Sequence, residues 1–462
     1  MHGRVIAAIS LMTMSAGAAL AQNRAAPAAR PAPAAAAPTV MFPLAQTCAP
    51  VTAGGGGGGR GGQAAPAAGG QAAPAGAQAA QGGQGGRGGS PVDTTYANYG
   101  AVGLPSDSQR IAGNRARGGT GIDNVSVRTL ATAGVPGNGV LGGVCMTSED
   151  SLIASVVARL DFENYKSLLR GLGEFGDRWA GNPVGPGNAK AVDWIEAQLK
   201  SYGYTTERIK YSYQGSPREE VYATKVGSTT PNEMYILGAH MDGRGGGAAI
   251  NDDGSGTALV MEIARVLSSP DIQTGRSIRF CLWNNEETGL NGAQAYVDQR
   301  QLLQGIETPA GSKKYNEPKW LGIIQHDMLL WDHGNPPMIM QSLSADVNVE
   351  FQLNSAKAAE SAQLGVTLIN SNRLFATNYP AQLSNSMSNT DTGPFMNLIP
   401  SVSLRDGRRL YEMGRGSSPT YHQPTDIIAS FTDQDYRLGF NAIQTTLGAV
   451  TKLTGMKIIP KS

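Results

Sequence analysis

Cysteine is scarce in this sequence, with three residues in 462. Cys48, Cys145 and Cys281 match no spacing that is typical of thiolate metal sites. Cys281 lies in the apolar run 278–283, which predicts a buried core thiol. We therefore expect none of the three cysteines to be catalytic.

A basic surplus is also missing. The net charge is +1, but residues 1–92 contain five arginines and no acidic residue, which leaves 32 basic and 36 acidic residues in the rest. A mildly acidic body without a basic face is not typical of proteins that bind phosphate backbones. We expect no nucleic-acid partner.

Long apolar runs are absent after residue 21, so we expect no stable membrane insertion once the first segment is removed. Residues 1–21 carry His2 and Arg4, then an apolar run that ends in Ala-Leu-Ala, an order typical of an export signal. A membrane anchor is the alternative, but a run of 17 residues rich in Ala, Ser and Gly is short for a span. We predict a cleaved signal peptide and a periplasmic or secreted protein.

Acidic residues, Lys and aromatics are nearly absent from residues 22–90, where Phe42 is the only aromatic residue. Such a segment cannot bury enough apolar surface to offset its chain entropy, so we predict a disordered linker. Residues 91–147 show little periodicity and are predicted to form a loop-rich arm or appendage. Cys48 and Cys145 flank the Gly/Ala tract; they form a disulfide, which export would permit, or remain unpaired loop thiols.

Apolar periodicity predicts an α/β fold for residues 148–462. Helical spacing occurs in segments 152–160, 189–202 and 256–269. Short apolar runs typical of strands occur at 234–239, 277–283, 321–324 and 399–404. This alternation favours a mostly parallel, mixed central sheet with helices on both faces in a single domain. Ligands in such sheets bind outside the carboxyl ends of the strands.

Metal-ligand residue types follow three of these four predicted strands. The sequence reads G-A-H-M-D at 238–242, W-N-N-E-E at 283–287 and Q-H-D-M at 325–328. An acidic turn, I-N-D-D-G-S-G, spans 250–256, and Y-H-Q-P-T-D spans 421–426. Imidazoles with carboxylates suit zinc, and the carboxylates outnumber the needs of one ion. We therefore expect two zinc ions, an arrangement that activates water for attack on a carbonyl.

These five motifs resemble, in order, those of the dizinc exopeptidase family that includes secreted bacterial leucyl aminopeptidases and plasma glutamate carboxypeptidase. The resemblance covers about residues 165–455. It implies that residues 148–462 form a zinc peptidase catalytic domain that hydrolyses peptides or dipeptides. An aminopeptidase, which cleaves the N-terminal peptide bond, is the preferred interpretation.

The resemblance also assigns a ligand set. It implies that Asp252 bridges two zinc ions, with Glu287 and His422 completing one site and His240 and Asp327 the other. In isolation, a single such histidine is more often structural than metal-binding, and an N-D-D-G-S-G turn is more often a helix cap. The ordered set of motifs is what favours metal binding.

Catalytic roles follow from the same resemblance. Glu286 would be the general base, which takes a proton from water and delivers it to the leaving amine. Tyr421 would stabilise the oxyanion, although it could instead simply pack beside the site. Asp242 would orient the His240 ring, and a cis peptide bond would follow Asp252.

Some residues depart from the family pattern. Thr392 stands where a histidine is usual in the segment 390–395, which removes a basis for assigning it a role. His326 and His333 have no counterpart in the motifs and are predicted not to bind metal.

Substrate specificity stays open at this point. The stretch 405–409, with Arg405, Arg408 and Arg409, and also Arg415, could supply an arginine that reads a substrate carboxylate, as a carboxypeptidase or dipeptidase would need. A solvated loop is the alternative for this stretch. Two further classes remain: an acyltransferase resembling glutaminyl cyclase with one zinc, and an exported binding protein without catalysis.

Overall fold

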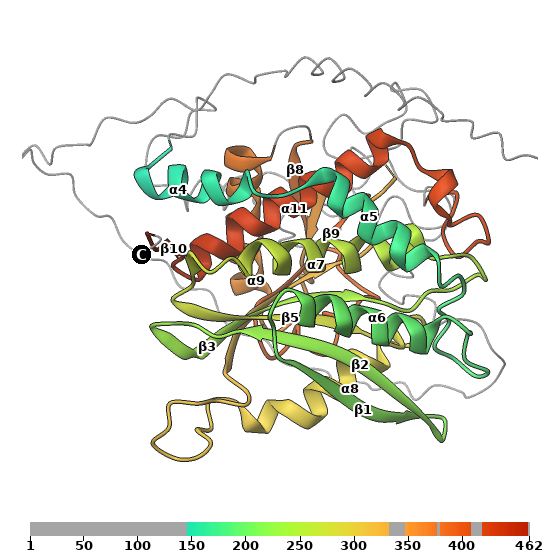
Figure 1. The fold of residues 1–462 in the computed structure, drawn as a ribbon, viewed down its shortest axis with the longest axis horizontal. Helices are drawn as coiled ribbons and strands as arrows, with labels where there is room; N and C mark the ends of the chain where they lie inside the picture. The colour runs from blue at the N-terminus through green and yellow to red at the C-terminus, as the bar shows by residue number, and fades with distance from the viewer. Residues whose placement is uncertain (1–145, 332–346, 377–378, 408–417, 461–462) are drawn as a thin grey trace, which may run out of the picture. The chain divides into compact units, whose positions relative to one another are not determined.

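An eight-stranded sheet forms the centre of the part of the chain that the computed structural model describes, residues 146–331, 347–376, 379–407 and 418–460 (Figure 1). The strand order is β1-β2-β5-β3-β6-β9-β7-β8. The strands are β1 (Thr206–Tyr213), β2 (Ser216–Lys225), β3 (Thr230–His240), β5 (Arg276–Trp283), β6 (Lys319–His326), β7 (Val347–Glu350), β8 (Ala381–Ser384) and β9 (Ser401–Arg405).

The middle of the sheet is parallel and its margins are mixed. Strand β3 pairs in parallel with β5 and β6, and β6 pairs in parallel with β9. The hairpin of β1 and β2 joins β5 in antiparallel fashion, and β7 joins β9 in the same way. This arrangement confirms the predicted fold class, and the four predicted strands correspond to β3, β5, β6 and β9.

Strand β9 begins two residues later than its apolar run suggests. The N–H of Ile399 donates to Phe395 O, so this residue still belongs to the preceding turn. Pro400 has no N–H with which to join a ladder. Regular pairing therefore starts at Ser401, opposite Ile323.

Seven helices of eight or more residues surround the sheet within the described ranges. They are α4 (Ser148–Val157), α5 (Phe162–Gly173), α6 (Asn188–Ser201), α7 (Ser255–Leu267), α8 (Asn291–Arg300), α9 (Ala358–Phe375) and α11 (Asp433–Leu453). The three predicted helices correspond to α4, α6 and α7. Helix α4 begins four residues before Leu152, because Thr147 and Asp150 form a capping box that satisfies its first backbone N–H groups.

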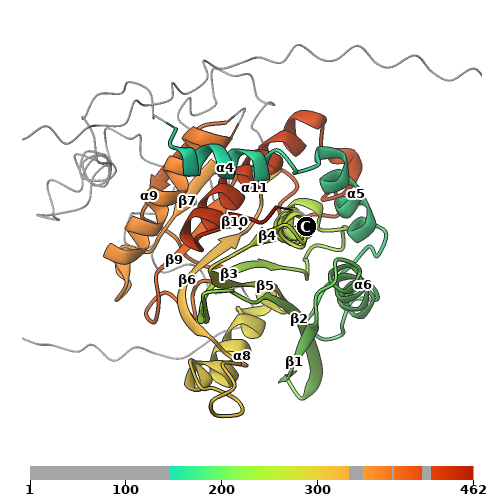
Figure 2. The same ribbon diagram turned by 60° about the vertical axis from the view of Figure 1, so that its left-hand side comes forward.

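Both faces of the sheet are covered by helices, as the alternation of buried residues in β5 illustrates. Phe280 and Leu282 join the larger hydrophobic cluster, which includes residues of α4–α7, α9 and α11, whereas Cys281 and Trp283 join a smaller cluster with α8. Figure 2 shows α8 across the sheet from α4 and α11. The predicted burial of the Cys281 thiol is confirmed.

None of the helices within the described ranges combines the length and apolar character needed to cross a membrane. The predicted signal peptide, linker and nearly all of the predicted arm lie outside these ranges, as do Cys48 and Cys145. His333, Arg408, Arg409 and Arg415 also lie outside them.

Candidate metal centre

Three strand ends bring predicted metal-binding residues to one edge of the sheet. Strand β3 ends at His240, and β6 ends directly before Asp327. Strand β5 is followed by the turn η2 (Glu286–Thr288). Because β3 lies between β5 and β6 and is parallel to both, these carboxyl ends are neighbours.

Asp252 reaches the same edge from the turn η1 (Ile250–Gly254), which precedes α7. The peptide bond between Asp252 and Asp253 is cis, which confirms what the family resemblance implied. Asp252 is 4% exposed, so its carboxylate is largely removed from bulk water.

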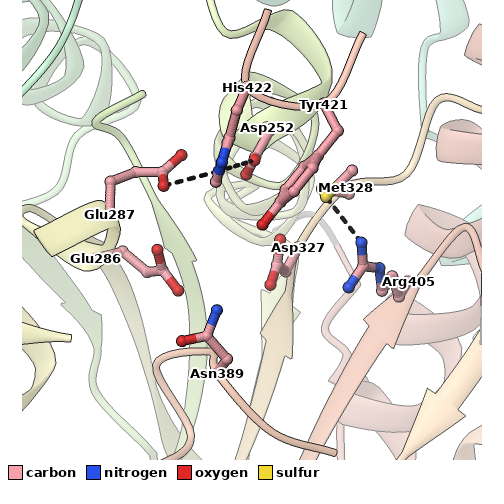
Figure 3. Close-up of a pocket in the computed structure, with 9 residues that line it drawn as sticks. All are labelled: Asp252, Glu286, Glu287, Asp327, Met328, Asn389, Arg405, Tyr421 and His422. Carbon is pink, nitrogen blue, oxygen red and sulfur yellow. Dashed lines mark hydrogen bonds and ion pairs between the residues drawn. The ribbon is translucent and has the colours of Figure 1, made fainter. Parts of the chain in front are cut away.

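Asp252 lies between the two predicted histidine ligands. Its Oδ1 is 3.3 Å from His240 Nε2, and its Oδ2 is 3.1 Å from His422 Nε2. His422 Nε2 is also 2.9 Å from Glu287 Oε2, a contact that Figure 3 shows. His240 Nε2 lies 3.9 Å from Asp327 Oδ1. One carboxylate therefore presents a different oxygen to each histidine.

The side chains at this edge form two groups with the donor set of a zinc site. Each group combines one imidazole with two carboxylates, and its ligand atoms lie within 4.8 Å of one another: His240, Glu286 and Asp327 in one, and Asp252, Glu287 and His422 in the other. All five predicted ligands are members. The predicted general base, Glu286, lies among them rather than apart.

An unpartnered atom at this edge also fits a metal. Glu287 Oε1 is buried and has no hydrogen-bond partner in the described part of the chain. Buried polar atoms are almost always satisfied, so an orphaned carboxylate oxygen in this donor set indicates a site built for a cation.

Crowding of carboxylates shifts the pKa values of the cluster. Burial, together with the charge of Glu287, raises the pKa of Glu286 well above its usual range. Burial and the charge of Asp252 raise the pKa of Glu287 to about 7. Burial opposes protonation of His422, yet Asp252 and Glu287 raise its pKa to about 9. The cluster therefore attracts positive charge strongly.

Asp253 and Asp426 hold the backbone around the cluster, and sequence reasoning did not single out either. Asp253 accepts hydrogen bonds from the N–H groups of His240 at 3.1 Å, Gly256 at 2.8 Å and Met328 at 3.3 Å. Asp426 accepts from the N–H groups of Asn251 at 2.8 Å and Asp252 at 3.0 Å. Their places in the motifs, as the second aspartate of N-D-D-G and the last residue of Y-H-Q-P-T-D, are the sequence signals that could have indicated a role for Asp253 and Asp426.

Asp242 contacts more than the ring it was expected to orient. Its Oδ1 accepts from the N–H of Glu286 at 3.1 Å, and its Oδ2 accepts from the N–H of Glu287 at 3.4 Å. Its distance to His240 Nδ1, 3.5 Å, is longer than an ordinary hydrogen bond. Asp242 thus mainly fixes the turn that carries the two glutamates.

His326 lies outside both groups and is held by structural hydrogen bonds. Its Nδ1 is 2.9 Å from Gly238 O and its Nε2 is 2.9 Å from Thr446 Oγ1. Burial lowers its pKa to about 4, so the ring is neutral and structural. Thr392 is buried and donates to Met387 Sδ at 3.1 Å.

A small polar pocket opens onto the cluster (Figure 3). Four carboxylates and His422 line it, together with Tyr421, Asn389, Met328 and Arg405. The Tyr421 ring stacks on His422 with centroids 3.7 Å apart, and burial raises the pKa of its hydroxyl above its usual range. Figure 3 shows this hydroxyl pointing into the pocket.

The parallel centre of the sheet and the paired histidine–carboxylate groups at its edge define an α/β domain of the zinc exopeptidase type. Residues 220–443 match the model of peptidase family M28. The chain therefore carries an M28 peptidase domain, and the family resemblance drawn from its motifs is confirmed.

Curated relatives match over shorter stretches. Leupeptin-inactivating enzyme 1 of Streptomyces exfoliatus is 34% identical over 112 residues, which cover 24% of this chain and 25% of that protein. The probable lipoprotein aminopeptidase LpqL of Mycobacterium tuberculosis is 39% identical over 108 residues, 22% of this chain and 21% of that protein. The chain thus matches about a quarter of the length of each.

Two solved structures have a similar fold. LapA of Legionella pneumophila has a TM-score of 0.52 at 18% identity, with 68% of this chain and 79% of LapA covered. LapB of the same organism has a TM-score of 0.51 at 18% identity, with 66% and 76% covered. At this identity the likeness supports the architecture of the domain.

We predict that the metal-free protein loses stability as the pH rises from about 6.5 to 9. The pKa of His422 is raised in the folded metal-free chain to about 9, from 6.5. Its stabilising contribution is complete below the unfolded value and disappears as the pH passes the folded one. The raised pKa of Glu287 acts in the same direction between 4.5 and about 7.

Thermal unfolding of chelator-treated protein across this pH range measures the effect. The melting temperature should fall with rising pH, and the His422→Gln variant should show a weaker fall. A melting temperature that stays flat or rises between pH 6.5 and 9 would contradict the pKa shift.

Proposed function

We propose that this protein is an aminopeptidase that removes N-terminal residues from peptides with the help of two zinc ions. The observation that carries the proposal is the position of Asp252, with one oxygen 3.3 Å from His240 and the other 3.1 Å from His422. A carboxylate in this position can give one oxygen to each of two ions. The M28 domain and the zinc-binding donor set support this assignment.

Asp252 would bridge the two ions, His422 and Glu287 would complete one site, and His240 and Asp327 would complete the other. When bound there, zinc supplies polarisation of the scissile carbonyl and a lowered pKa of the attacking water. Because Asp252 can serve both sites, neither site requires Glu286 as a ligand.

Glu286 is the proposed general base. Its side chain lies beside His240 and Asp327 and lines the pocket, so it can reach a water molecule near these ligands. The backbone N–H of Glu286 donates a hydrogen bond to Asp242 Oδ1, which limits the positions that the Glu286 side chain can take. Glu286 would accept the proton of the attacking water and then donate it to the leaving amine.

Tyr421 is the proposed donor to the oxyanion. Its ring is fixed by stacking on His422, and its hydroxyl end points into the pocket (Figure 3). Burial keeps this hydroxyl protonated by raising its pKa, so it can donate a hydrogen bond where negative charge develops.

The names of the matched relatives favour recognition of a free amino terminus, because the M. tuberculosis protein LpqL is called a probable lipoprotein aminopeptidase. In this proposal Asp252, Glu287 and Asp327 line the pocket as zinc ligands, so their charge would be offset by the ions. We also propose that residues 1–21 direct export, with the working site in the periplasm or outside the cell. This last step rests on the sequence of that segment alone.

A substrate panel tests the proposed activity. We expect purified protein to hydrolyse aminoacyl anilides and to leave N-blocked dipeptides intact, because an aminopeptidase requires a free amino terminus. A zinc chelator should abolish the hydrolysis, and added zinc should restore it. Cleavage of the N-blocked dipeptides but not of the aminoacyl anilides would contradict the aminopeptidase assignment. Cleavage of neither substrate class would favour a binding protein.

We predict that Glu286→Gln lowers kcat by about 10² to 10⁴-fold, the usual contribution of a general base. Its zinc content should stay at two ions per chain, since both sites can be completed without this side chain. Glu220→Gln is the control, because Glu220 is also buried but belongs to neither ligand group. Turnover of Glu286→Gln within a few fold of the wild type would remove Glu286 from the mechanism.

Carboxylate recognition is a second candidate, which Arg405 favours. This residue ends β9 and lines the pocket, and its Nη2 lies 3.0 Å from Met328 Sδ. Pairing between β6 and β9 fixes its position one strand away from Asp327. A planar guanidinium at this point suits a substrate carboxylate, as a carboxypeptidase or dipeptidase would require.

The substitution Arg405→Met separates the two candidates. For an aminopeptidase we expect KM for aminoacyl anilides to change by less than about threefold, because these substrates carry no carboxylate. For an enzyme that reads a carboxylate, a loss of one charged hydrogen-bonding pair would raise KM for free dipeptides by tenfold or more, about 1.5 to 3 kcal/mol. Arg276→Met, far along β5 and paired with Glu233, is the control.

A further inference from the structure

Arg178 is a fully buried guanidinium behind the metal centre, with an exposed fraction of 0%. Its Nε donates to Met241 O at 2.7 Å, and its Nη2 donates to Ala249 O at 2.9 Å. Its Nη1 donates to Ala248 O and reaches Leu172 O at 3.5 Å. One side chain thus binds the backbone of three separate segments.

Two of these contacts lie at opposite ends of one loop. Met241 directly follows the ligand His240, and Ala249 comes three residues before Asp252. Ala249 has a φ of +50°, a left-handed conformation that is unfavourable for alanine and must be held by its surroundings. Arg178 fastens both ends of the loop 241–249, and so it links the two segments that carry His240 and Asp252.

Backbone carbonyls buried in this loop depend on Arg178 for hydrogen bonds. Leaving a buried acceptor unsatisfied is costly, so loss of the guanidinium would drive Ala248 and Ala249 toward another conformation. Turn η1 follows directly after Ala249, so the conformation of this loop determines the position of η1 and of Asp252 within it.

The charge of Arg178 is suited to its place. Burial lowers its pKa, while the nearby carboxylates of Asp426, Asp242 and Asp253 act in the opposite direction. Arginine nevertheless remains protonated in proteins, so a permanent positive charge lies behind a cluster of carboxylates. This charge offsets part of their repulsion in the absence of metal.

We propose that Arg178 is a positioning residue that preforms the metal centre by fixing loop 241–249 between His240 and Asp252. The proposal rests on the proposed two-zinc function. Lysine cannot replace this residue fully, because a single ammonium group lacks the rigid planar array of donors that reaches carbonyls on three segments.

Arg218 provides a matched control. It is 6% exposed, and it also donates to backbone carbonyls, through Nε to Ala180 O at 2.7 Å and through Nη2 to Gly181 O at 2.6 Å. None of its hydrogen bonds goes to loop 241–249. Its replacement should disturb stability without a specific effect on metal binding.

Metal affinity of the full chain, without any substrate, tests the proposal. Metal-free wild type, Arg178→Lys, Arg178→Met and Arg218→Met are titrated with zinc in competition with a chromophoric chelator, and with cobalt to record its absorption spectrum. We expect Arg178→Lys to bind zinc about 10- to 100-fold more weakly, which is the usual effect of replacing a residue that orients metal ligands. We also expect this variant to have an altered cobalt spectrum. Arg178→Met should bind still more weakly, and Arg218→Met should stay within about twofold of wild type.

The lysine variant decides the outcome even where Arg178→Met does not fold. A purely structural role would lower the melting temperature of Arg178→Lys and leave its zinc affinity and cobalt spectrum unchanged, which would overturn the proposal. A wild-type chain that binds fewer than two zinc ions would contradict the proposed two-zinc function instead. The two failures are therefore distinguishable.

Discussion

Repulsion among buried carboxylates is the constraint on which the rest of the site depends. Asp252, Glu286, Glu287 and Asp327 line one small pocket, and burial raises the pKa values of Glu286 and Glu287. Burying such a group of like charges costs stability, and a bound cation would offset that cost. Two zinc ions would supply that compensation, and the same ions would make the site useful for hydrolysis.

The fold holds these repelling groups together through their backbones. Strands β3, β5 and β6 deliver the ligands to one edge by their pairing, independently of any metal. Three further carboxylates, those of Asp253, Asp426 and Asp242, accept hydrogen bonds from backbone N–H groups of the segments that carry the proposed ligands. These carboxylates fix the backbone and are not among the proposed ligands. Positioning and metal binding are therefore separate tasks of neighbouring acidic residues.

The sequence predicts the centre of the sheet, and the gathering of the proposed ligand residues at its edge, better than it predicts what surrounds them. Strands β3 and β5 are marked by buried apolar runs, and the ligands by short motifs at their ends. The strands β7 and β8, with four residues each, and helix α9, whose buried face includes Ser361, Ser371 and Asn372, lack so clear a pattern. The role of Arg178 could not be predicted from the sequence, because its shortest hydrogen bonds go to backbone carbonyls 63 to 71 residues away, which no side-chain motif marks.

Anomalous scattering from a crystal of the zinc-loaded protein, recorded at the zinc absorption edge, tests the central claim most directly. The account predicts two peaks about 3.5 to 4 Å apart, with one oxygen of Asp252 toward each of them. A single peak, or two peaks of which only one contacts Asp252, would contradict it.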